Sequence, residues 1–159
     1  MSDPRWLDVD SDVAGALLHF GRAVDIHRAW TTGVGDRDFY ILSMAFMHAM
    51  LAGHTSVEVA LVWVLDLLDE EKPSGPDWHQ MLITRMARSL EGEYARPALL
   101  TSTLAKALKE NKDFRHRALH TYDDFDFDRA RPAVEAAIVI AEEFPRVILA
   151  FKDKIDPAP

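Results

Sequence analysis

Residues 39 to 70 read FYILSMAFMHAMLAGHTSVEVALVWVLDLLDE, a stretch that is apolar on nearly all sides. Apolar side chains all around a helical repeat predict a helix that is buried at the centre of a bundle. Gly53 stands near the middle of this stretch and is expected either to bend the helix or to divide it in two. The rest of the chain should therefore be built around this helix.

Amphipathic segments flank the central stretch on both sides. Before it, residues 11 to 30 carry an apolar stripe at helical spacing, at Val13, Leu17, Phe20 and Val24. After it, the break Lys72-Pro73-Ser74-Gly75-Pro76 precedes a shorter predicted helix over residues 78 to 90. A further helix should follow a cap at Thr101, Ser102 or Thr103. The last should begin near Pro132 and be kinked or shortened by Pro145.

These segments predict an all-α bundle of four long helices and one short helix. The length of 159 residues fits a single domain, residues 1–159, with a tail frayed from about residue 154. The chain has no cysteine, which excludes disulfides, thiolate catalysis and cysteine-ligated zinc.

The sequence predicts a cytoplasmic protein that does not enter a membrane. Its start, MSDPRWLDVD, is polar and acidic and lacks the apolar run of a signal peptide. The most apolar segment, residues 57 to 68, is too short to cross a bilayer and is interrupted by Asp66.

The charge is unevenly distributed along the chain. The formal net charge is −8, which argues against a long basic track for duplex DNA. Residues 106 to 120, however, carry five basic and two acidic side chains, a net of +3, and an acidic loop from Asp123 to Asp128 follows. A solvated helix face explains this contrast, and so does a compact contact with phosphate. The acidic loop is expected to be a solvated turn with a capping aspartate, or else a docking surface for a basic partner protein.

The segment Phe114-Arg115-His116-Arg117-Ala118-Leu119-His120-Thr121-Tyr122 contains Arg-x4-His-x-Tyr. From the composition, this triplet is expected by chance only about 0.01 times in the chain. Arg22 and His27 share the first spacing, but Ala29 occupies the third position. On a helix, Arg115 and Tyr122 share a face, while His120 lies about 140° away from Arg115. A long arginine stem can bridge that offset, or the helix can loosen near His120.

This set of side chains suits metal-free cleavage of RNA. The imidazole of His120 can take the proton of a ribose 2′-hydroxyl, and Arg115 can neutralise charge on the phosphate oxygens. The 2′-oxygen would then attack the adjacent phosphate and leave a 2′,3′-cyclic end. Because one histidine supplies only one acid or base, a symmetric dimer that pairs two such sites is attractive. Lys112, His116 and Arg117 are further candidates for contacts with RNA phosphates.

The motif resembles the signature of HepT proteins, the HEPN partners of MNT-type nucleotidyltransferases. Trp78-His79, Arg96-Pro97 and Phe114-Arg115-His116 also resemble a HepT-like subgroup, over about residues 40 to 152. The resemblance implies an up-and-down bundle, a homodimer with facing motifs, and a toxic, metal-independent endoribonuclease without cofactors. It also implies an MNT-type antitoxin that adenylylates Tyr122. One departure is His116, because a small polar residue is common at that position in HEPN proteins.

Two other interpretations stay open. His48, His116 and His120 are candidate ligands of a metal-dependent enzyme resembling DinB-like bundles. A HEPN bundle can also bind a nucleotide or a partner protein without catalysis. Elsewhere, His54 and Glu58 are expected to form an ordinary pair within one helix, although Glu58 can also point into the active cleft. His79 is expected to stabilise the start of its helix.

Overall fold

The computed structural model describes residues 4–30, 34–120 and 125–157. Short 3-10 helices lie at Pro4–Trp6 and Gly92–Tyr94. The long helices are α1 (Leu7–Ala29), α2 (Asp36–Leu67), α4 (Ser102–His120) and α5 (Arg131–Ile155), and the short helix is α3 (Trp78–Met86). Within these ranges the only strand-like feature is an isolated bridge between Leu90 and Arg96. The predicted all-α bundle of four long helices and one short helix is confirmed.

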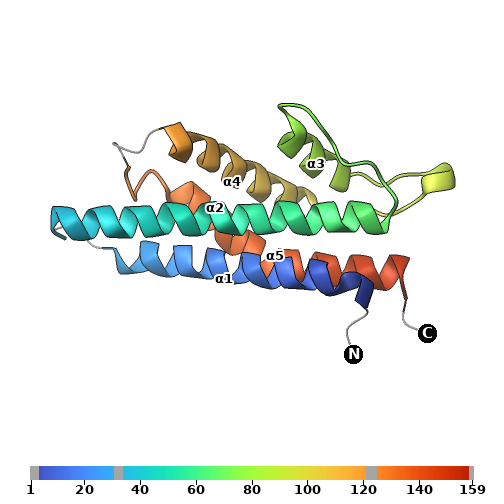
Figure 1. The fold of residues 1–159 in the computed structure, drawn as a ribbon, viewed down its shortest axis with the longest axis horizontal. Coiled ribbons are helices and arrows are strands. Elements are labelled where there is room, and N and C mark those ends of the chain that lie inside the picture. Colours follow the sequence, from blue (N-terminus) through green and yellow to red (C-terminus); the bar gives the residue numbers. More distant parts are fainter. Residues whose placement is uncertain (1–3, 31–33, 121–124, 158–159) are drawn as a thin grey trace.

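The helices are arranged around α1 and α2, which run antiparallel along the length of the molecule (Figure 1). Helix α5 packs against α1 and α4, and α4 also contacts α2. Helix α3 lies beside α4 and touches α2, so three helices meet at one side of the bundle. The start of α1 and the end of α5 lie at the same end of the molecule (Figure 1).

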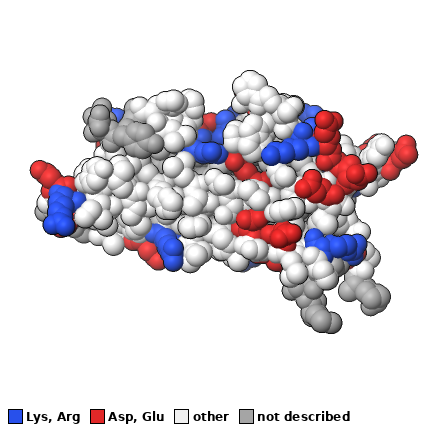
Figure 2. All heavy atoms as spheres, viewed as in Figure 1, with Lys and Arg blue, Asp and Glu red and all other residues white. Residues whose placement is uncertain are grey.

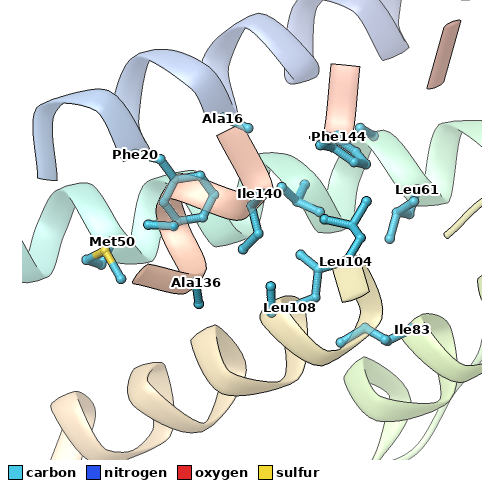
Figure 3. Packing of buried hydrophobic residues seen from close by; sticks show 14 of the residues in the cluster. Ala16, Phe20, Met50, Leu61, Ile83, Leu104, Leu108, Ala136, Ile140 and Phe144 are labelled. Carbon is cyan, nitrogen blue, oxygen red and sulfur yellow. The ribbon is translucent and has the colours of Figure 1, made fainter. Parts of the chain in front are cut away.

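The core lies where the inner faces of the four long helices meet. Apolar side chains from each of them interleave, as Figure 3 shows for Ala16, Phe20, Met50, Leu61, Leu104, Leu108, Ala136, Ile140 and Phe144. Ile83 brings α3 into the same cluster. Burial of this apolar surface is the main favourable contribution to folding.

Gly53 allows α1 and α2 to approach closely. A Cβ at this position would lie 2.9 Å from Cδ1 of Phe20, closer than two carbons pack. Helix α2 runs through Gly53 from Asp36 to Leu67, so the glycine does not divide it. The missing side chain makes room for a neighbouring helix.

The helix ends follow local chemistry. The backbone N–H of Leu104 donates to Oγ1 of Thr101 over 3.1 Å, so Thr101 caps α4, one of the three predicted caps. Helix α3 ends at Met86 rather than near Leu90, because the following loop is held by other contacts. Arg96 is buried there, binding Glu70 and donating to the carbonyl of Arg88 over 2.9 Å.

The last helix has proline in its first turn, as predicted, and continues through Pro145 to Ile155. Pro145 therefore does not end it. Beyond α5, the Asp156 carboxylate accepts hydrogen bonds from Arg5 over 2.6 Å and from Nε1 of Trp6 over 3.1 Å. These two bonds hold the start and the end of the bundle together.

Helix α2 is long and apolar enough, by length and composition alone, to cross a membrane. The central helix of a globular bundle meets the same criterion, and half of the most apolar window of α2 is buried inside the structure.

Candidate active site

The final turns of α4 carry the predicted catalytic residues. Phe114 and Ala118 are buried, and the Phe114 ring lies edge-on to Phe46 of α2, 5.9 Å between centroids. This packing fixes the rotation of α4 and leaves Arg115 half-buried, with His116, Arg117 and His120 exposed. The basic residues of the motif therefore stand on the outer face of the bundle.

Glu58 of α2 lies beneath Arg115 as a buried carboxylate, 4% exposed. Its Oε2 accepts a hydrogen bond from Nη1 of Arg115 over 3.2 Å. Its Oε1 accepts from Nε2 of His54 over 3.0 Å and also from Nδ1 of His79 at the start of α3. We call these four residues the Glu58 cluster. The cluster joins α2, α3 and α4 at the point where the three helices meet.

The neighbours of Glu58 keep its carboxyl ionised. Burial raises the pKa of Glu58, but hydrogen bonds and charge from His54 and then from His79 lower it, and the net pKa lies below its ordinary value of 4.5. Arg115 adds a positive charge at 3.2 Å. The carboxylate can therefore accept hydrogen bonds from all three side chains at neutral pH.

Three cavities surround the end of α4. The basic cavity, of about 550 Å³, is lined by His79, Gln80, Lys112, Arg115, His116 and Arg117 among others. The end cavity, of about 560 Å³, includes His116, Arg117, His120, Phe125 and Arg129. The aromatic cavity, of about 290 Å³, includes Glu58, Trp63, Lys72, Trp78, His79 and Arg115. His79 and Arg115 thus separate the basic from the aromatic cavity, while His116 and Arg117 separate the basic from the end cavity.

The two predicted catalytic side chains face adjacent cavities rather than one. Helix α4 is regular through His120, so the offset of about 140° from Arg115 is kept over this part of the chain. His116 connects the two, because its ring lies 4.8 Å from that of His120 and it also lines the basic cavity with Arg115. Tyr122 lies outside the described residues.

The three-histidine metal site is not formed. His48 is exposed, and its ring lies 6.4 Å from His19 of α1, whereas His116 and His120 pair with each other on α4. No group of three or more His, Asp or Glu side chains among the described residues is arranged to hold a metal ion. The alternative interpretation as a three-histidine site is not supported, because the His48 ring lies beside His19 of α1 and away from the α4 histidines.

A protein-family model described as HepT-like protein matches residues 45–155, more than half of the chain. The chain is a HepT-like protein. The family belongs to the HEPN superfamily. Neither a curated protein nor a solved structure matches the chain significantly.

In this HepT-like chain the matched region begins within α2 and ends at the last residue of α5, so α1 lies outside it. This agrees with the sequence analysis, in which the resemblance begins at about residue 40 and therefore leaves out the first predicted helix. All four members of the Glu58 cluster and both histidines of α4 lie within the match.

Sequence reasoning underestimated Glu58 and His79 in this HepT-like chain. The pair with His54 was expected and is present, but Glu58 also reaches Arg115, which the alternative interpretation as a cleft residue anticipated. His79 binds Glu58 across helices and does more than stabilise its own turn. The available signal was a glutamate in the middle of a mostly apolar helix, because a buried charge requires partners.

Proposed function

We propose that this HepT-like protein is a metal-independent endoribonuclease, and that it acts as the toxin of a toxin–antitoxin pair. The observation that carries the proposal is the arrangement at the end of α4. An arginine held by a buried carboxylate stands between two cavities, and exposed imidazoles line the cavity next to it. Family membership supports the same chemistry.

In the proposed reaction, His120 takes the proton of the ribose 2′-hydroxyl. The 2′-oxygen attacks the adjacent phosphorus, the bond from phosphorus to the 5′-oxygen breaks, and a 2′,3′-cyclic phosphate forms. Arg115 neutralises the negative charge that builds on the non-bridging oxygens. Lys112, His116 and Arg117 line the basic cavity and would hold flanking phosphates.

Glu58 orients Arg115 for this role. The carboxylate binds Nη1 of Arg115, and the side chain is 29% exposed, so the guanidinium is fixed on its inner side while its outer side faces the cavities. A guanidinium has five N–H donors, which is enough to bind a carboxylate and a phosphate together. A fixed donor needs little rearrangement when charge develops in the transition state.

Regulation and assembly are proposed from the family. An MNT-type nucleotidyltransferase would silence the protein by adenylylating Tyr122, which is close in sequence to His120, placing a bulky anion in the site. A homodimer would bring two motifs together, in the cytoplasm, where both RNA and antitoxin are present.

The decisive experiment is cleavage of a mixed-sequence RNA in EDTA by the purified, unmodified protein. Wild type should cleave and leave 2′,3′-cyclic ends, whereas Arg115→Ala and His120→Ala should each lose at least about 100-fold in rate. His19→Gln, on α1 and away from these cavities, should cleave like wild type. A folded wild-type protein that binds RNA but leaves it intact would contradict the proposal and favour a binding module.

A further inference from the structure

His79 is the most precisely held histidine beside Arg115. It lies in the first turn of α3, directly after the Pro/Gly-rich break, with its ring 3.8 Å from that of Trp78. Lys72 lies over the Trp78 ring, with its Nζ 4.9 Å from the ring centroid. Nδ1 of His79 is bound to the buried carboxylate of Glu58. The ring is therefore fixed on one edge by Glu58 and in its plane by Trp78.

These contacts determine which ring nitrogen is available. Because Nδ1 donates to Glu58, the other nitrogen, Nε2, remains for a ligand, and the side chain is 28% exposed. His79 lines the basic and the aromatic cavities, and Arg115 is the other side chain that lines both. A carboxylate on one imidazole nitrogen fixes the tautomer and the orientation of the other nitrogen. This is how enzymes commonly prepare a histidine for proton transfer.

We propose that His79 is the general acid of the ribonuclease reaction, an inference that rests on the proposed function. His120 takes the proton of the 2′-hydroxyl as the 2′-oxygen bonds to phosphorus. As the bond from phosphorus to the 5′-oxygen breaks, Nε2 of protonated His79 gives its proton to that oxygen, which leaves as a hydroxyl. His120 ends the step protonated and His79 neutral, and exchange with water restores both.

The cavities allow one RNA strand to reach both groups. His116 and Arg117 line the basic cavity with His79 and the end cavity with His120, so the two cavities meet along α4. A phosphate at Arg115 would lie beside His79, with the adjoining ribose toward His120. Each chain of the proposed homodimer would then carry both an acid and a base.

His116 is the competing candidate for the same role. It is exposed and lines the basic cavity, but its ring contacts His120 and it has no carboxylate partner within the described residues. His79 has such a partner in Glu58. The geometry therefore favours His79, and a variant of each residue separates the two.

The test uses two RNA oligomers that differ at one linkage. One has the normal 5′-oxygen, and the other has a bridging 5′-sulfur, which leaves as a thiolate without needing a proton. His79→Asn is the variant of choice, because the asparagine amide can still donate to Glu58 but lacks Nε2. It should cleave the oxygen linkage at least about 100-fold more slowly than wild type and the sulfur linkage at nearly the wild-type rate.

His120→Ala should be slow on both linkages, because loss of the base is not rescued by a better leaving group. His116→Gln should slow both linkages to the same extent, as the loss of a phosphate contact would, whereas His19→Gln on α1 should cleave both like wild type. Unchanged melting temperatures would show that the variants are folded. Equal loss on both linkages in His79→Asn, or equal retention on both, would overturn the assignment of His79 while leaving the ribonuclease intact. A wild-type protein that cleaves neither oligomer would overturn the proposed function and this inference with it.

Discussion

Glu58 is a carboxylate in a place where an unpartnered charge would be very costly, and donors from three helices compensate it. Removing the carboxylate would leave the buried His54 and the half-buried His79 and Arg115 without their shared acceptor. The cluster therefore connects stability to the proposed function at a single residue, because the contacts that join the three helices also orient Arg115 and His79.

We expect Glu58→Gln to lower the free energy of unfolding by about 1–3 kcal/mol at pH 7, because two histidines and an arginine lose a charged acceptor. The carboxyl pKa is lowered in the folded protein, so its stabilising contribution is fully present above the ordinary value of 4.5. That contribution is lost as the pH falls through the lower, folded-state pKa. Wild type and variant should therefore converge in acid.

Urea unfolding between pH 7 and pH 3 measures this difference. Glu142→Gln, an exposed site on α5, is the matched control and should follow wild type at every pH. A gap between wild type and Glu58→Gln that widens toward acid would contradict an ionised Glu58.

At the scale of elements, helix periodicity predicted the bundle well, because each long helix has an apolar face that it must bury. The residues of the site were only partly predictable. Arg115, His116 and His120 lie on one helix, so their relation follows from spacing. Glu58, His79 and Arg115 lie on three helices, and their meeting depends on how α3 sits against α2 and α4. No local pattern encodes that packing.

The contact between α1 and α2 gives a prediction at this scale. Gly53→Ala should destabilise the protein by about 1–3 kcal/mol, because the added methyl would overlap the Phe20 ring, which is fully buried. Gly21→Ala is the control in α1, where a Cβ meets nothing within 4 Å. It should be neutral or stabilising by up to about 1 kcal/mol. Thermal unfolding compares the two variants. Equal effects would contradict the prediction, because they would mean that α1 and α2 can move apart to accept the methyl group without loss of stability.

At the scale of the whole molecule, the charge distribution limits where the proposed RNA substrate could bind. The net charge is −8, and basic side chains gather over α3 and α4, while acidic ones gather toward the end where α2 stops (Figure 2). Elsewhere in this view the basic side chains stand in small, separate groups (Figure 2). Contact with RNA should therefore be short.

This limit predicts a shallow dependence of RNA binding on salt. If Lys112, Arg115 and Arg117 make the phosphate contacts, the slope of log affinity against log salt should be about −2 for single-stranded RNA. Fluorescence anisotropy with the cleavage-deficient His120→Ala variant measures it. Adding Lys112→Ala should reduce the slope by about 0.7, whereas adding Lys106→Ala, on the same helix but outside these cavities, should not. A slope steeper than about −5 would mean that RNA contacts many more basic side chains than these three.

The bond between Glu58 and Arg115 also bears on which anions can occupy the site. Any incoming anion meets a guanidinium that an internal carboxylate already shares, so a small ion such as chloride or inorganic phosphate gains little from Arg115 alone. A polymer that touches several cations at once gains from each additional contact and can overcome this competition. In the proposed site, the internal carboxylate would therefore favour an extended chain of phosphates over abundant small ions.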